Sequence, residues 1–271
     1  MSPETVLTDH IAGKLAQHPT GRPLVIGLCG AQGSGKSTLA ARLAARFPDS
    51  AVLSLDDLYL PRAARAALAA SVHPLFATRG VPGTHDVALG LDIFARLDAG
   101  LPVSLPRFDK AADDRVPAAA WPRAAMPCRL ILFEGWCVGA RAQADEALAR
   151  PVNALEASDD RDGAWRYAVN AALAGDYARL FARIDDLVLL AAPDWPTVPR
   201  WRREQERALR QRTTGIGIMD EAALIRFVAH YERLTRWILD EMPLRALTLR
   251  LDAERRLRAV EPPPHVEASR R

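Results

Sequence analysis

Residues 30–37 combine glycines, a lysine and a serine at a spacing that can bind phosphate groups. The segment reads Gly-Ala-Gln-Gly-Ser-Gly-Lys-Ser and matches the Walker A pattern G-x-x-x-x-G-K-[ST]. Its glycines let backbone N–H groups point into one concavity, and a helix that begins there adds partial positive charge. We therefore expect the phosphates of a nucleotide to be bound by the whole segment and the next residue: Gly30, Ala31, Gln32, Gly33, Ser34, Gly35, Lys36, Ser37 and Thr38.

Two side chains of this loop have expected chemical roles. Lys36 is expected to reach the β- and γ-phosphates, and the Ser37 hydroxyl to hold Mg²⁺. The loop follows an apolar run at 23–29 and precedes a helix-patterned run at 37–46. This strand–loop–helix order favours a phosphate site over a glycine-rich turn with an accidental lysine.

Phosphoryl transfer also needs acidic residues, and these follow two predicted strands. Asp56 and Asp57 come after the apolar segment 51–55, and Glu134 follows the apolar run 129–133. Ligands of parallel sheets bind at the carboxyl ends of the strands. We expect Asp56 to orient or deprotonate an acceptor hydroxyl, and Glu134 to bind Mg²⁺ through water. A turn-capping carboxylate and an ordinary strand-end acid are the alternatives.

Two loops carry candidate contacts to the acceptor. Residues 79–86 read Arg-Gly-Val-Pro-Gly-Thr-His-Asp, and residues 108–115 cluster charges around Lys110. A small anionic acceptor needs a cation, and a histidine can donate a hydrogen bond. A helix-capping turn and a solvated loop are the alternatives. The candidate acceptor contacts are Asp57, Tyr59, Arg79, Thr84, His85, Asp109, Lys110 and Arg115.

Further candidates lie late in the chain. A helix predicted over 197–213 carries arginines that a lid could bring to the transferring phosphoryl group, or that pair with Glu204 and Glu206 on the helix surface. These arginines are Arg202, Arg203, Arg207, Arg210 and Arg212. The loop from Asp252 to Arg256 is the candidate adenine contact.

Apolar runs and helical periodicity alternate along the chain. Strands are predicted at 23–29, 51–55, 129–133, 186–190 and 244–251, with a short one at 103–106. Helices are predicted at 4–18, 37–46, 61–72, 86–97, 164–183, 197–213 and 220–240. This alternation predicts an α/β fold with a mostly parallel central sheet flanked by helices on both faces.

The connections between these elements suggest how the chain is organised. We expect one domain over 1–260, with acceptor-binding and lid insertions at about 60–128 and 195–220. Residues 107–128 read as a loop, residues 156–163 as a charged surface connection, and residues 261–271 as a disordered tail.

Composition narrows the classes of partner. The 271 residues are 49% hydrophobic and 25% charged, which is ordinary for a globular protein, and the net charge of +3 argues against nucleic-acid binding. We find no signal peptide and no stretch of membrane-spanning length. The three cysteines have no metal-binding spacing. We therefore expect a cytoplasmic protein, monomeric or homodimeric, without a membrane partner.

Several segments resemble known kinases. Ser54-x-Asp56-Asp57-x-Tyr59 with Phe133-Glu134-Gly135 resembles the phosphoribulokinase, uridine kinase and pantothenate kinase group. Other segments resemble the D-glycerate 3-kinase family more specifically. They are Arg79-Gly80-x-Pro82-Gly83-Thr84-His85-Asp86, Pro106-x-Phe108-Asp109-Lys110, Glu134-Gly135-Trp136-Cys137-x-Gly139, Trp201-x-x-x-Gln205-Glu206 and Phe227-x-x-x-Tyr231-x-Arg233-x-Thr235.

This resemblance implies a P-loop NTPase fold and a kinase that uses ATP and Mg²⁺ to phosphorylate a hydroxyl of a small hydroxy acid. The expected hydroxy acid is D-glycerate. The resemblance also places Asp56 near the acceptor hydroxyl and matches Glu134 to the family's strand-end glutamate. The alternatives are a uridine (nucleoside) or pantothenate-type kinase and, in another class, a nucleotide-dependent regulatory module.

Overall fold

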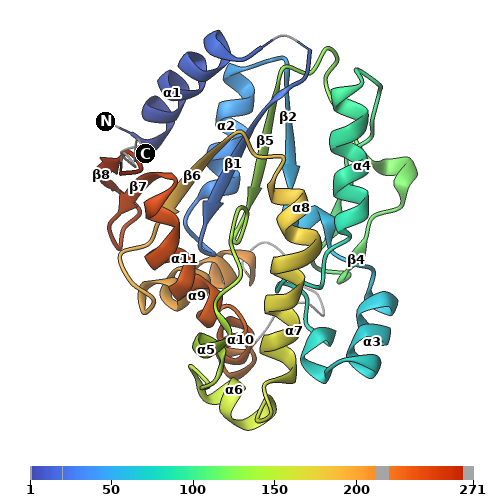
Figure 1. The fold of residues 1–271 in the computed structure, drawn as a ribbon, viewed down its shortest axis with the longest axis vertical. Helices are drawn as coiled ribbons and strands as arrows, with labels where there is room; N and C mark the ends of the chain where they lie inside the picture. Colours follow the sequence, from blue (N-terminus) through green and yellow to red (C-terminus); the bar gives the residue numbers. More distant parts are fainter. Residues whose placement is uncertain (1, 20, 211–219, 265–271) are drawn as a thin grey trace, which may run out of the picture.

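The computed structural model describes residues 2–19, 21–210 and 220–264, and a sheet of six strands forms the centre of this part (Figure 1). In chain order the strands are β1 (Leu24–Gly30), β2 (Ser50–Ser54), β5 (Leu130–Gly135), β6 (Asp186–Ala191), β7 (Leu247–Leu251) and β8 (Leu257–Glu261). Their order across the sheet is β2-β5-β1-β6-β7-β8. The first five strands run parallel and β8 is antiparallel to β7, which confirms the predicted mostly parallel sheet.

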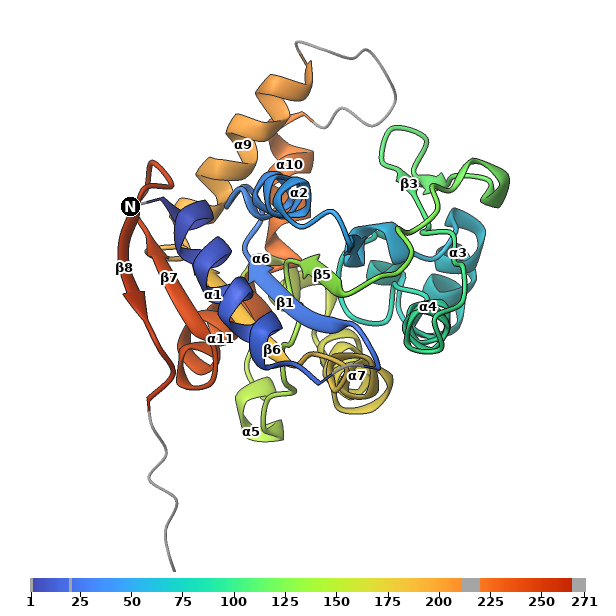
Figure 2. The same cartoon turned by 90° about the horizontal axis from the view of Figure 1, so that it is seen from above.

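Helices cover both faces of the sheet, as the alternation predicted (Figures 1 and 2). Alternate residues of β1 point into two separate cores, with Leu24 and Ile26 in one and Val25 and Cys29 in the other. The first core is covered by α1 (Pro3–Gln17), α2 (Lys36–Arg46) and α9 (Thr197–Arg210). The second core is covered by α4 (Val87–Asp98), α7 (Ala164–Ala172), α8 (Ala178–Phe181) and α11 (Glu232–Glu241).

Strand register brings the predicted acids to the phosphate-binding loop. Ser54 at the end of β2 pairs with Glu134 of β5, and Gly135 pairs with Cys29, the residue before Gly30. Three adjacent strands therefore deliver their last residues to one edge of the sheet. Both β1 and β5 are buried along their whole length, as expected of strands with covered faces.

The segment between β2 and β5 holds short elements around the candidate acceptor loops. They are a 3₁₀ turn (Leu55–Leu58), α3 (Arg62–Ser71), a second 3₁₀ turn (Pro74–Ala77), α4, the antiparallel pair β3 (Phe108–Asp109) and β4 (Asp114–Arg115), and a third 3₁₀ turn (Ala118–Ala120). The predicted strand at 103–106 is reduced to a bridge between Ser104 and Arg123. The predicted loop 107–128 contains the β3–β4 hairpin.

Later helices are more broken than predicted. The predicted helix 164–183 is α7, a π-helical turn (Leu173–Tyr177) and α8, and the predicted helix 220–240 is α10 (Glu221–Ala229) and α11. Small helices α5 (Asp145–Leu148) and α6 (Ala154–Asp159) precede α7, and a 3₁₀ turn (Met242–Leu244) precedes β7. In the described ranges no helix has both the length and the apolar character that a membrane span requires.

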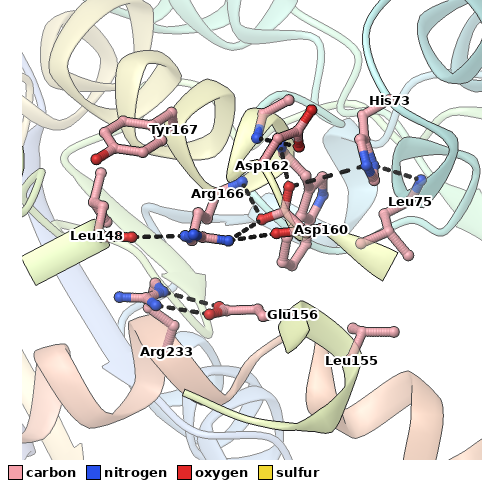
Figure 3. A network of polar contacts seen from close by, with 12 residues as sticks. His73, Leu75, Leu148, Leu155, Glu156, Asp160, Asp162, Arg166, Tyr167 and Arg233 are labelled. Carbon is pink, nitrogen blue, oxygen red and sulfur yellow. Dashed lines mark hydrogen bonds and ion pairs between the residues drawn. The ribbon is translucent and has the colours of Figure 1, made fainter. Parts of the chain in front are cut away.

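The charged segment 156–163 is exposed only in part, so its prediction as a surface connection was wrong for its buried acids. Glu156 and Asp160 are buried, and each pairs with an arginine (Figure 3). Arg233 of α11 donates to Glu156 at 2.8 and 2.7 Å, and Arg166 of α7 donates to Asp160 at 3.0 Å. Moving an ion out of water costs several kcal/mol, and the attraction and hydrogen bonds within each pair offset that cost. The two pairs also join α6, α7 and α11.

The end of the chain also departs from the prediction. Glu261 pairs with Thr248 at the end of β8, so disorder from residue 261 onward was wrong for that residue. Residues 265–271 of the predicted tail lie outside the described residues.

Candidate active site

The phosphate-binding loop joins β1 to α2 with backbone angles that favour glycine. Gly33 has φ +80° and Gly35 has φ +90°. A Cβ atom on Gly33 would lie 2.6 Å from Cβ of Trp201 in α9. The loop therefore needs glycine at position 33 both for its left-handed backbone and for its close approach to α9.

Glu134 and Ser37, the two residues predicted to hold a hydrated cation, lie next to each other. Glu134 is buried, and its Oε1 accepts hydrogen bonds from Ser37 at 3.0 Å and from Ser54 at 2.7 Å. Its Oε2 is buried without a hydrogen-bond partner among the described residues. An unpaired buried acceptor is costly, and a hydroxyl and a carboxylate are oxygen ligands of the kind Mg²⁺ prefers. The residues present thus fit a magnesium ion that retains water and binds phosphate oxygens.

Sequence reasoning gave Ser54 no role of its own, although its place at the end of a strand beside Glu134 was a usable signal. In the part of the chain described, no three His, Cys, Asp or Glu side chains group into a metal site of their own.

Asp56 lies in the turn after β2 and accepts two hydrogen bonds. Tyr59 donates to its Oδ1 at 2.8 Å, and Lys110 of the β3–β4 hairpin donates to its Oδ2 at 2.6 Å. Burial alone would raise the pKa of Asp56, but the charges of Lys110 and Lys36 and the two hydrogen bonds outweigh burial and lower it. Asp56 is therefore an ionised carboxylate with its oxygens held in place.

The two other acids in the predicted acceptor set make local hydrogen bonds. Asp57 accepts from the Phe108 amide at 3.0 Å and from Arg107 at 3.2 Å, and burial raises the pKa of Asp57. Asp109 accepts from the amides of the next turn at 2.8 and 3.2 Å. Asp57 therefore fastens the hairpin, Asp109 shapes its tip, and a direct acceptor contact for either stays a prediction.

Arg79 and Arg115 hold the acceptor loops together. Arg79 pairs with Asp113, and its guanidinium lies 5.6 Å from the centre of the Phe108 ring. Arg115 pairs with Asp86 at 3.1 Å and donates to the carbonyl of Tyr59 at 2.9 Å.

Thr84 closes the turn of the 79–86 loop. Its hydroxyl is buried, donates to the Val81 carbonyl at 2.7 Å and accepts from the Gly80 amide at 3.0 Å. These bonds account for the hydroxyl, so a contact between Thr84 and the acceptor stays a prediction that the geometry does not favour.

His85 is buried between two tyrosines. Its ring stacks on Tyr59 with centroids 4.6 Å apart, and its Nδ1 lies 2.5 Å from the hydroxyl of Tyr177. Burial lowers the pKa of His85 to about 3, so the ring is neutral at physiological pH. Sequence reasoning missed Tyr177, which lies in an alanine-rich helical segment that carries no motif.

Gly80 lies where the 79–86 loop packs against the residue before α11 and the residue after β5. It has φ +135°, and a Cβ atom there would lie 1.9 Å from the hydroxyl oxygen of Tyr231. That hydroxyl donates to the Arg79 carbonyl at 3.1 Å, and the Trp136 indole donates to the Gly80 carbonyl at 2.8 Å. The loop is therefore fixed by residues from two distant parts of the chain.

Two of the α9 arginines form ion pairs, one with a buried glutamate of the same helix and one with α10. Arg202 pairs with Glu206 at 3.0 Å, and Arg203 pairs with Glu221 of α10 at 2.6 Å. The side chain of Arg210, and Arg212 entirely, lie outside the description. Which arginine reaches the transferring phosphoryl group stays a prediction.

The loop predicted to contact adenine lies against the phosphate-binding loop. Arg255 donates to the Gly33 carbonyl at 2.5 Å, and its guanidinium lies 5.1 Å from the centre of the Trp201 ring. It also borders a cavity of about 300 Å³ that reaches Thr38 and Leu251. This neighbourhood supports the prediction, which no bound nucleotide tests.

Comparison with known proteins shows what this chain is similar to. No family model matches it. The protein named "Uncharacterized kinase mug58" of Schizosaccharomyces pombe is 37% identical over 250 residues, which cover 85% of this chain and 87% of that protein. The chloroplastic D-glycerate 3-kinase of Arabidopsis thaliana is 32% identical over 223 residues, which cover 77% of this chain and 46% of that protein.

The chain belongs to the D-glycerate 3-kinase-like family of P-loop kinases. It is a phosphotransferase that acts on an alcohol group. A solved D-glycerate 3-kinase from Cryptococcus neoformans var. grubii serotype A has the same fold, with a TM-score of 0.78 and 23% identity. The match covers 95% of this kinase and 98% of that chain.

Proposed function

We propose that this kinase transfers the γ-phosphate of ATP to a hydroxyl of D-glycerate. Two relatives by sequence or fold are named D-glycerate 3-kinases, although this chain covers only about half of the Arabidopsis protein. The observation that carries the proposal is the placement of an ionised carboxylate, Asp56, between Tyr59 and the cation Lys110. That arrangement suits an acceptor that has a hydroxyl and a negative charge close together.

The donor half of the reaction is assigned to the phosphate-binding loop. Its amides and Lys36 bind the phosphates, and Ser37 and Glu134 hold Mg²⁺, with Glu134 acting through water. The bound ion supplies charge neutralisation at the phosphate oxygens. The cavity beside Arg255 and Thr38 is the proposed binding site of the adenine base of ATP.

The acceptor half is assigned to Asp56 and Lys110. The acceptor oxygen forms its bond to the γ-phosphorus as the β–γ bridging P–O bond breaks, and ADP leaves with the bridging oxygen. The hydroxyl proton leaves through Asp56. Because Lys110 already pairs with Asp56 at 2.6 Å, an incoming carboxylate would compete for the same ammonium group. Drawing Lys110 toward the substrate would make Asp56 more basic when it is needed.

Coupled detection of ADP release tests the proposal. Purified protein with MgATP is given D-glycerate, uridine, pantothenate or ribulose 5-phosphate, and Lys36→Met serves as the inactive control. Turnover that depends on D-glycerate is expected. Turnover with uridine or pantothenate alone would assign another kinase activity, and ADP release indifferent to every acceptor would favour a regulatory module. Cytoplasmic location and oligomeric state stay predictions.

A further inference from the structure

The hydroxyl of Tyr177 contacts three polar groups of the 79–86 loop. The amides of Gly83 and His85 lie 3.0 and 3.2 Å from its oxygen, and Nδ1 of His85 lies 2.5 Å away. Tyr177 and His85 are both buried. These contacts can be compared with the number of hydrogen bonds that each group is able to donate or accept.

The count leaves one arrangement of protons. Both amides must donate, so they occupy the acceptor positions of the Tyr177 oxygen. The single proton of that hydroxyl remains to be donated, and Nδ1 of His85 is the acceptor that the geometry offers. A proton on Nδ1 would set donor against donor. Nδ1 of His85 therefore carries a lone pair, and the proton of the neutral ring is on Nε2.

Nε2 of His85 is then a hydrogen-bond donor that needs an acceptor. It is buried without a hydrogen-bond partner among the described residues. Leaving a buried donor unpaired is unfavourable, and native structures avoid it unless a ligand or water completes the bond. The His85 ring stacks on the Tyr59 ring, and the Tyr59 hydroxyl donates to Asp56. Only the Tyr59 ring therefore separates the imidazole of His85 from the proposed catalytic acid.

We infer that Tyr177 is a positioning residue that fixes His85 as the Nε2–H tautomer, so that His85 donates a hydrogen bond to an oxygen of the acceptor. This inference rests on the proposed function and deepens it, since it names the atom and the residue that sets its proton. A hydroxyl or carboxylate oxygen fits such a site.

Nitrogen NMR of histidine-labelled protein reads the tautomer without turnover. Comparison with His85→Gln assigns the His85 signals in the wild type. We expect Nδ1 to have the nitrogen chemical shift of an unprotonated ring nitrogen. We also expect the Nε2 signal to move when D-glycerate is added. A protonated Nδ1 would overturn the inference, as would an Nε2 signal that D-glycerate leaves unmoved while the enzyme turns it over.

Matched variants separate positioning from structure. A glutamine at 85 can place its amide nitrogen where Nε2 lies, whereas an asparagine reaches only the Nδ1 position. We expect His85→Gln to keep the KM for D-glycerate within a few-fold, and His85→Asn and Tyr177→Phe to raise it roughly tenfold at unchanged KM for ATP, the effect of one lost hydrogen bond.

Equal KM values for the glutamine and asparagine variants would overturn the inference, because a merely structural role does not distinguish them. Thermal melting checks that each variant folds. If D-glycerate is not a substrate at all, the proposed function fails, while the tautomer measured in the free protein still tests the role of Tyr177.

Discussion

Replacing Asp56 by asparagine should abolish most turnover and leave the fold nearly unchanged. The variant keeps the shape and an oxygen for the hydrogen bond from Tyr59. It loses the ion pair with Lys110, whose side chain is 57% exposed, and solvent-exposed pairs contribute about 0–1 kcal/mol. Losing a positioned acid–base group costs roughly 10²–10⁴-fold in rate, or about 3–5 kcal/mol in the barrier. The expected loss of activity is therefore larger than any loss of stability.

Three measurements on Asp56→Asn check this reasoning. Coupled ADP release gives kcat with D-glycerate, calorimetry gives the affinity for MgATP, and urea denaturation gives the free energy of unfolding. Because the charge of Asp56 interacts with Lys36, ATP affinity should stay equal or increase slightly. Asp92→Asn, on the exposed side of α4, is the matched control. A folded Asp56→Asn enzyme with kcat within tenfold of the wild type would refute the assignment of the acceptor proton to Asp56.

Three further outcomes are expected. Lys110→Met removes the strongest influence that lowers the pKa of Asp56, so the acid limb of the kcat/KM profile should move to higher pH; identical limbs in variant and wild type would contradict this. Gly33→Ala places a side chain at φ +80°, which costs roughly 1–2 kcal/mol before any clash with α9, and should lower both the melting temperature and ATP affinity. Arg233→Met leaves a buried carboxylate without its partner and should lower the free energy of unfolding, measured in urea, by about 3–5 kcal/mol. Arg236 lies on the same helix with its side chain 51% exposed, and Arg236→Met should lower that free energy by under about 1 kcal/mol.

The phosphate-binding loop and the strand-end acids could be predicted because their signals are local. The loop, its preceding strand and its following helix are contiguous, so one stretch of sequence carries the whole motif. Asp56 and Glu134 follow apolar runs directly, and parallel register then brings such strand ends to one edge. Pattern and geometry agree at these positions.

Features that depend on distant contacts could not be predicted in the same way. The bond from Arg255 to Gly33 spans 222 residues, and that between Tyr177 and His85 spans 92. Glu156 has the charge of a surface residue, and its burial is possible because Arg233 lies beside it in the fold, 77 residues later. No local pattern distinguishes a charge that has such a partner from one that faces solvent.

The close approach at Gly80 limits how this family can diverge. Since the ring carbon that bears the Tyr231 hydroxyl would itself lie 2.4 Å from a Cβ at position 80, trimming the hydroxyl alone does not make room. A chain that gained a side chain at 80 would need a much smaller residue at 231 and a different backbone bend. These two positions should therefore covary among homologues, and new acceptor preferences should arise through neighbours such as Arg79 rather than through a side chain at position 80.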